Sequence, residues 1–218
     1  MHMNLVNQLQ EAAKRDDVLN VLRKAKCVSA KLGRKDLCRW VEYEQNGYLD
    51  ADAVPEYRLI PVTLCYKTNS PVPADCDRLG NGIVSLSGIV KGCDSPIIRP
   101  ISDVLNLVES IKFGQGMFIP LPPEVTRSLH GALKCNKPDL FDQVKFMARL
   151  DDSHVRAIPE HIKKRVLDWA CDLEAAGVTG DDQAFSNKEK ETAQTVIFNI
   201  NNSSIDQLNN SGNNIKGE

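Results

Sequence analysis

The chain has 218 residues, of which 42% are hydrophobic and 26% are charged, and its formal net charge is −2. This length predicts one globular domain, or one domain with an appendage, that buries about 70% of its unfolded surface. The small net charge excludes a global attraction to nucleic acid or to an anionic membrane, so either contact would need a local patch. Apolar runs fall short of the ~18 residues of a membrane helix and the N-terminus lacks signal-peptide features, so we expect a cytoplasmic protein without membrane contact.

The seven cysteines and four histidines form no pattern typical of disulfides or zinc. The cysteines are odd in number and contain no Cys-x-x-Cys pair, and the histidines form neither His-x-x-x-His nor His-Glu-x-x-His. In a cytoplasmic protein this favours reduced thiols that act as small core side chains. We therefore expect no metal and no cofactor.

Three helices are predicted in the first fifty residues. A short one carries Leu5, Leu9 and Ala12 on one face. A second is capped by Asp16 or Asp17, carries an apolar stripe and ends at Gly33. A third buries Leu37, Trp40 and Val41 and stops at Asn46-Gly47. The short Gly33-Arg34 joint predicts an antiparallel or crossed helical hairpin.

The middle of the chain predicts a small sheet with a helix. Residues 57–66 are rich in β-branched and aromatic side chains, but Pro61 makes them an edge strand or two short pieces. Residues 83–90 are a candidate strand, a helical face runs from Val104 to Ile111, and a short apolar run covers residues 117–119. Strict alternation over residues 144–150 is the clearest strand signal.

A pair of helices is predicted near the C-terminus. The first begins at Pro159, carries Ile162, Val166, Trp169 and Leu173 on one face, directs Lys163, Lys164 and Arg165 mostly outward, and ends at Gly177. Ser186 stands three residues before Glu189, the spacing of a capping box, so the second helix begins there. The fold class is therefore α+β, with an N-terminal helical hairpin, a small β-containing middle and a C-terminal amphipathic helix pair.

The last residues form an Asn-rich tail, in which asparagine fills seven of the final twenty positions. Alone, such a segment buries too little apolar surface to become ordered. The alternative is that Thr195 to Ile200 forms a strand that pairs with other copies, with Ile197, Phe198 and Ile200 as oligomerisation residues. We accordingly divide the chain into a module at 1–194 and a tail at 195–218, and expect the tail to order only in a homo-oligomer.

Two separate stretches carry a family resemblance. Residues 25–58 contain Ala30-Lys31-Leu32-Gly33, Trp40-Val41, Glu44, Asn46-Gly47-Tyr48 and Val54-Pro55-Glu56-Tyr57-Arg58. The second contains Arg165 to Trp169, Leu173-Glu174, Gly177-Val178, Phe185-Ser186, Glu189 and an Asn-Ile-Asn-Asn tail. Together they resemble the two ends of the AbiTii domain of bacterial abortive-infection proteins. The resemblance implies defence against phage, in which an infected cell stops growing or dies, and implies no enzyme activity.

The preferred function is therefore a non-enzymatic component of anti-phage defence that senses, adapts or self-associates. Its partners would be copies of itself and a partner defence protein or a phage component. The alternative is an effector that binds or cleaves nucleic acid through the basic residues around the first hairpin and an acidic pair. These candidate contacts are Arg23, Lys24, Lys31, Arg34, Lys35 and Arg39. Acidic neighbours weaken the field of such a face, and basic helix surfaces are usually only solvated.

No catalytic set emerges from the remaining polar residues. The pairs Asp151-Asp152 and Asp181-Asp182 suit helix capping and a turn better than a divalent metal. Cys171 stands beside the apolar stripe of its helix, where burial would make its thiol inert. Trp40 and Trp169 are predicted core anchors.

Overall fold

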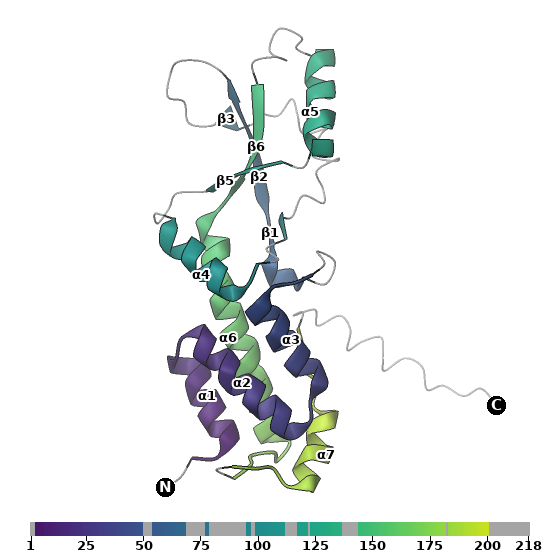
Figure 1. Cartoon of the computed structure of the whole chain (residues 1–218). Coiled ribbons are helices and arrows are strands. Elements are labelled where there is room, and N and C mark those ends of the chain that lie inside the picture. The colour runs from purple at the N-terminus through teal and green to yellow at the C-terminus, as the bar shows by residue number, and fades with distance from the viewer. Residues whose placement is uncertain are drawn as a thin grey trace, which may run out of the picture. The chain divides into compact units, whose positions relative to one another are not determined.

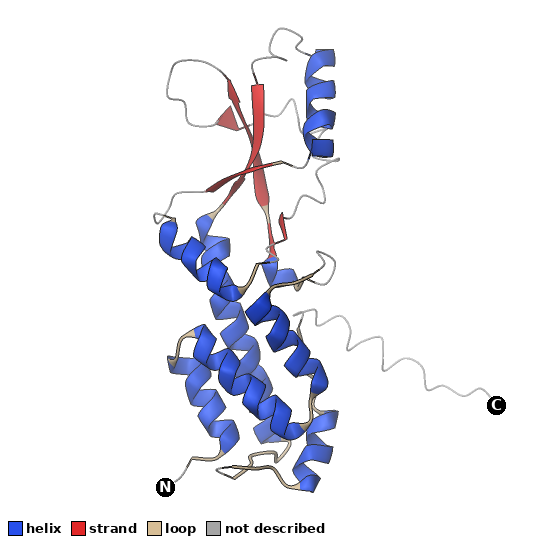
Figure 2. Cartoon of the chain, viewed as in Figure 1, coloured by secondary structure: helices blue, strands red, loops and turns tan. Residues whose placement is uncertain are grey.

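The computed structural model describes residues 3–49, 54–68, 77–78, 95–96, 99–111, 117–121, 123–136, 144–181 and 183–200. The chain divides into two compact units. The helical unit contains residues 1–45, 55–57 and 160–218, and the sheet unit contains residues 46–54 and 58–159. Helices build the first and strands with helices build the second, which confirms the α+β class (Figures 1 and 2).

The helical unit begins with the predicted helices. They are α1 (Leu5–Arg15), α2 (Val18–Leu32) and α3 (Lys35–Asn46). The Asp17 carboxylate accepts a hydrogen bond from the Asn20 amide at 3.0 Å and thereby caps α2. Gly33 ends α2 with φ of 73°, a left-handed conformation that other residues rarely adopt. The capping residues and the Gly33 stop are thus confirmed.

Two further helices complete this unit. They are the part of α6 (Asp152–Ala175) that follows Pro159, and α7 (Asn187–Thr195). A loop joins the two helices, and in this loop Gly177 has φ of 78°. The Val178 amide donates to the Leu173 carbonyl at 2.9 Å, which closes the end of α6. Ser186 and Glu189 form the predicted capping box at the start of α7.

The start of α6 differs from the prediction. The helix begins at Asp152, so Pro159 lies inside it and not in its first turn. Proline removes one helical hydrogen bond, but Val155 and Ile158 are fully buried and Asp152 pairs with Arg156 at 3.0 Å. These contacts favour the extra turns, and the division between the two units falls directly after Pro159.

The core of the helical unit contains both tryptophans. Trp40 and Trp169 are 2% and 1% exposed, which confirms them as core anchors. Fully buried aliphatic side chains from α1, α2, α3 and α6 complete it. These are Leu9, Leu22, Leu32, Leu37, Ile162 and Leu173. Burial of each contributes about 1.5–3 kcal/mol, which is why the helices need no strong propensity of their own.

The sheet unit is antiparallel. Its larger sheet has the order β3-β2-β6-β5, from β3 (Asp77–Arg78), β2 (Val62–Thr68), β6 (Val144–Leu150) and β5 (Met117–Pro120). Val62 pairs with Leu150 and Thr68 with Val144, so β2 and β6 match along their full length. A second sheet pairs β1 (Leu59–Ile60) with β4 (Ser95–Pro96). Pro61 separates β1 from β2, as predicted.

Two helices accompany these strands: α4 (Ile101–Ser110), which was predicted, and α5 (Pro123–Asn136), which was not. Leu129 of α5 packs with Val144 and Phe146 of β6 in a buried cluster. The candidate strand at residues 83–90 lies outside the described residues. None of the helices in the described ranges is both long and apolar enough to cross a membrane.

Candidate functional site

The segment from Val196 to Ile200 is the most distinctive feature of the helical unit. It follows α7 and has neither helical nor strand structure. Thr195, expected to open a strand, instead ends the helix, and its hydroxyl donates to the Thr192 carbonyl at 2.7 Å. The expected strand over Thr195–Ile200 is therefore absent within the chain, because side chains of the helical unit bind this segment's carbonyls.

Arg34 binds the beginning of the segment. Its Nη1 donates to the carbonyls of Ala193 and Val196 at 2.6 and 2.5 Å, and its Nε and Nη2 pair with Asp36 at 2.9 and 2.7 Å. The hydrogen bond from Arg34 is the main cause that lowers the pKa of Asp36. Arg34 is only 6% exposed. Arg34 was predicted to contact nucleic acid; its guanidinium instead closes the end of α7, which sets it apart from the exposed candidates.

Arg165 binds the other end. Its Nε donates to the Ile200 carbonyl at 2.5 Å, and its guanidinium lies 4.2 Å from the centre of the Tyr57 ring. Burial lowers the pKa of Arg165, while Tyr57 and the carboxylates of Asp168 and Glu44 oppose this shift. Arg165 is 4% exposed, so its predicted outward orientation is wrong.

Phe198 lies between these two arginine contacts. Its ring centre is 4.8 Å from that of Trp40 and 6.2 Å from that of Trp169, and the latter pair is edge-to-face. Phe198, predicted as an oligomerisation residue, therefore packs within its own chain against the core of the helical unit. We call Arg34, Trp40, Arg165 and Trp169 the segment socket, since together they hold residues 196–200.

A buried hydrogen-bond chain supports the socket. The Trp40 indole donates to the Tyr57 hydroxyl at 3.1 Å, and this hydroxyl donates to Glu44 Oε1 at 2.5 Å. Glu44 is fully buried, so its carboxylate is placed to orient Tyr57 and balance Arg165. Burial, followed by the charges of Arg165 and Lys164, lowers the pKa of the neighbouring His161 and favours its neutral form.

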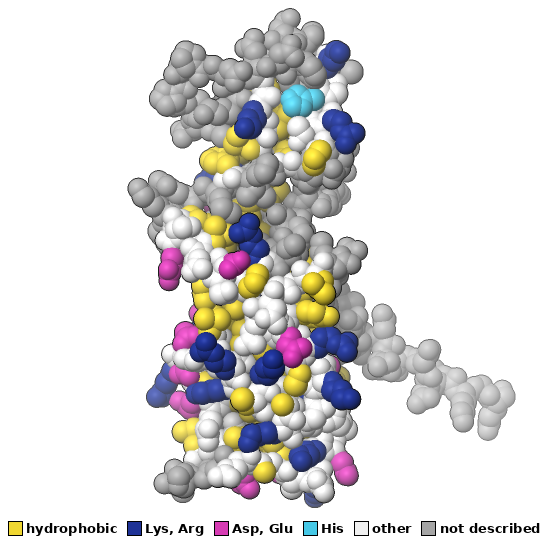
Figure 3. Space-filling model, viewed as in Figure 1, with side chains coloured by type: hydrophobic (Ala, Val, Ile, Leu, Met, Phe, Trp, Pro, Cys, Tyr) yellow, Lys and Arg dark blue, Asp and Glu magenta, His cyan; other side chains and the backbone are white. Residues whose placement is uncertain are grey.

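Five of the predicted nucleic-acid contacts are exposed on α2 and α3: Arg23, Lys24, Lys31, Lys35 and Arg39. Arg23 donates to the Asn20 side chain at 2.9 Å, Lys24 pairs with Asp16 at 3.0 Å, and Lys31 donates to the Gln183 carbonyl. Figure 3 shows Lys and Arg side chains spread over the visible face of this unit with Asp and Glu among them. These five cations are thus exposed, and three of them already bind an oxygen acceptor of the same unit.

One member of each acidic pair, Asp152 and Asp181, has a structural role. Asp181 Oδ1 accepts the amides of Gln183 and Ala184 at 2.8 and 2.6 Å, as the predicted turn requires. These two hydrogen bonds lower the pKa of Asp181. Asp182 lies outside the described residues. Cys171 is exposed, so the prediction that it is buried is wrong.

Glu44, Tyr57 and Arg165 were not recognised from the sequence as parts of one site. The available signal was helical spacing, because Glu44 follows Trp40 by four residues and Arg165 precedes Trp169 by four. A charged residue one turn from a buried tryptophan shares its face and needs a partner there.

The comparisons with known proteins place the chain in one family. The family model AbiTii matches residues 4–198, which include every residue of the segment socket and Phe198. No curated protein and no solved structure matches the chain. The match covers far more than half of the sequence, as the two resembling stretches led us to expect. The chain therefore belongs to the AbiTii family, and this membership implies a role in abortive-infection defence against phage.

Proposed function

We propose that the chain is a non-enzymatic component of an abortive-infection system that acts through protein contacts and associates with copies of itself. The observation that supports this is that the segment socket holds residues 196–200 with the Ile197 side chain exposed to solvent. Val196 is 9% exposed, and Phe198 packs on two tryptophans, whereas the Ile197 side chain between them is 70% exposed. The socket thus fixes a large apolar side chain toward solvent.

The main chain beside Ile197 offers a second element of contact. Within the described parts of the chain, the amides and carbonyls of residues 197–199 have no hydrogen-bond partner. Val196 has extended dihedrals, with φ of −76° and ψ of 120°. Unpaired main chain next to an exposed apolar residue is a template on which a second chain can add a strand. Self-pairing of this segment stays our prediction, with Ile197 as the contacting side chain and Phe198 as its intramolecular anchor.

A charge placed on Ile197 tests this proposal. Ile197→Asp should lower the mass measured by light scattering toward the 24.2 kDa of one chain while leaving the melting temperature nearly unchanged. Phage protection in cells should fall with the mass. The matched control is Leu49→Asp, which introduces the same charge at a side chain that is 95% exposed and should keep mass and protection. A wild-type mass of one chain, or a mass that Ile197→Asp leaves unchanged, would contradict the proposal.

The nucleic-acid alternative rests on the five exposed cations. It predicts that RNA or DNA binding falls steeply with salt and weakens when Lys35 and Arg39 are replaced by alanine. If binding is absent at low salt while Ile197→Asp abolishes protection, the protein-contact function is favoured.

A further inference from the structure

A hollow in the helical unit opens between α1 and α2. Its volume is about 190 Å³, and it is lined by Leu5, Gln8 and Leu9 of α1 and by Arg23, Lys24, Cys27 and Val28 of α2. Leu9 and Val28 are 0% and 4% exposed and form its apolar floor. We call these seven residues the α1/α2 groove. It shares no residue with the segment socket, so what it binds is a question separate from self-association.

The size of the groove limits its ligand. Sites for cofactors and drug-sized molecules usually enclose about 300–1,000 Å³, well above the volume found here. A hollow of this size accepts one large aliphatic or aromatic side chain. The groove therefore suits an anchor residue of a peptide, as when an amphipathic helix lays its apolar face on a helical pair.

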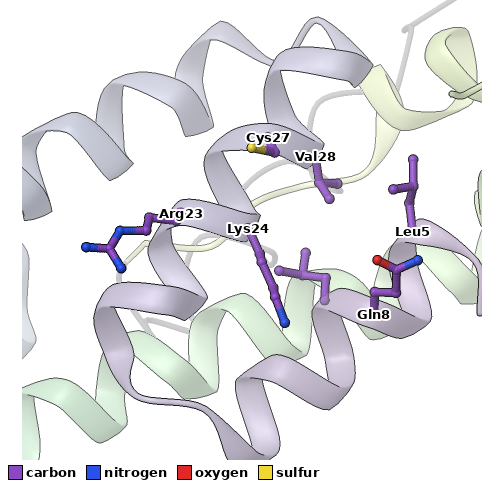
Figure 4. A pocket seen from close by; sticks show the side chains of 7 residues that line it. Leu5, Gln8, Arg23, Lys24, Cys27 and Val28 are labelled. Carbon is purple, nitrogen blue, oxygen red and sulfur yellow. The ribbon is translucent and has the colours of Figure 1, made fainter. Parts of the chain in front are cut away.

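The two charged residues of the groove, Arg23 and Lys24, indicate the charge of the peptide that it binds. Figure 4 shows the Lys24 side chain extending between the two helices, while Arg23 projects to the side, both from α2. Within the described residues, Lys24 forms a partly exposed ion pair with Asp16 and Arg23 bonds the neutral amide oxygen of Asn20. A carboxylate is a stronger acceptor than an amide, so Arg23 gains by binding an acidic ligand, and the partly exposed Lys24 adds a second positive charge beside the apolar floor.

We infer that the α1/α2 groove binds an acidic amphipathic segment of another protein, with a leucine-sized anchor on the floor and carboxylates against Arg23 and Lys24. This inference goes beyond self-association, because it assigns the chemistry of a different partner to a different surface. The apolar floor supplies the affinity, and the two cations select acidic over basic sequences.

A designed peptide tests the inference on the full chain. The probe is a fluorescein-labelled helix of about 16 residues with leucines at i, i+3 and i+7 and glutamates elsewhere on its surface, and a second peptide has lysines in place of the glutamates. The glutamate peptide should bind at least about tenfold more tightly than the lysine peptide. Bound peptide should also slow alkylation of Cys27 while leaving Cys171 unchanged, since both thiols are exposed in the free protein.

Charge-reversal variants separate the groove from general electrostatics. Replacing Arg23 and Lys24 by glutamate should lower the affinity for the acidic peptide about tenfold or more. The matched control replaces Lys188 and Lys190, two exposed lysines of α7, by glutamate and should bind as wild type. The inference is overturned by equal affinity for both peptides, equal loss in both variants, or unprotected Cys27. Protection of Cys27 by a single-stranded RNA, or by raising the protein concentration alone, would likewise overturn it in favour of another occupant.

Discussion

Removing the aromatic ring of Phe198 is the most direct way to measure what the segment socket contributes to stability. The ring contacts Trp40 and Trp169, and the residue itself is half-buried. A fully buried phenylalanine loses about 3–5 kcal/mol on truncation to alanine, part of which comes from aromatic pairs worth about 0.5–1.5 kcal/mol each. For a half-buried ring with both pairs intact, we expect Phe198→Ala to lower the free energy of unfolding by about 2–3 kcal/mol.

The assay is urea and thermal unfolding followed by tryptophan fluorescence. The chain has two tryptophans, and both lie in the helical unit against Phe198, so the signal reports this unit. A loss of this size corresponds to a fall in melting temperature of about 4–12 °C for a chain of this length. Measurements at two protein concentrations separate folding from association.

Ile197→Ala is the control, because this neighbouring side chain is 70% exposed and should cost under about 0.5 kcal/mol. Equal unfolding free energies for the two variants would refute the reasoning, since they would show that the segment is not held by Phe198.

The contacts of Phe198 bear on the prediction for the tail as well. Residues 196–200 pack in the single chain, so the expectation that the tail orders only in a homo-oligomer is wrong for them.

Four other predictions have defined outcomes. Trp169→Ala should cost about 3–5 kcal/mol in urea unfolding, and an unchanged midpoint would contradict its place in the core. A chain ending at residue 200 should melt as wild type, whereas one ending at residue 195 should melt lower, because it lacks the carbonyls bound by Arg34 and Arg165. Asp151→Ala, Asp181→Asn and Cys171→Ser should each keep phage protection, and its loss in a stably folded variant would reveal a missed active site. Burial raises the pKa of Glu189, but hydrogen bonds from the Gly180, Ser186 and Thr179 amides and the Ser186 hydroxyl outweigh it and lower the pKa to about 2. This carboxylate therefore stabilises the fold above its unfolded pKa of 4.5, and melting curves should lose that stability between about pH 4.5 and 2 in wild type and not in Glu189→Gln.

Local signals in the sequence were sufficient for most of the helical elements. Asp17 and Gly33 determine where α2 begins and ends, and the Ser186–Glu189 capping box determines where α7 begins. Each acts through contacts within a few residues of the chain. Pro61 similarly divides β1 from β2, because proline cannot donate to a strand ladder. The helix α5 was missed because Gly131 interrupts its pattern, and its stability comes from packing Leu129 on β6, a contact across the sequence.

The site was much less predictable from the sequence. The exposure of charged residues was predicted from their local patterns, whereas the segment socket depends on contacts between residues far apart in the chain. Arg34 follows a glycine in a basic stretch, which is typical of an exposed cation. Its actual partners, the carbonyls of Ala193 and Val196, are more than 150 residues away. Arg165 stands beside two lysines, so solvent exposure was the reasonable expectation for it as well. Its burial was indicated only by its spacing of four residues from Trp169, which puts both side chains on one face of α6.

The two buried arginines explain how a segment without regular structure can be held in a defined position. A carbonyl outside a helix or sheet must find a donor when it is buried, and a guanidinium offers several in one plane. Arg34 uses its donors on α7, on Val196 and on Asp36, while Arg165 reaches Ile200 from α6. Both ends of the segment are thus fixed by charge-assisted hydrogen bonds, and Phe198 fixes its middle. Ile197 and the main chain of residues 197–199 stay accessible to another molecule, which is why we propose that self-association uses this segment.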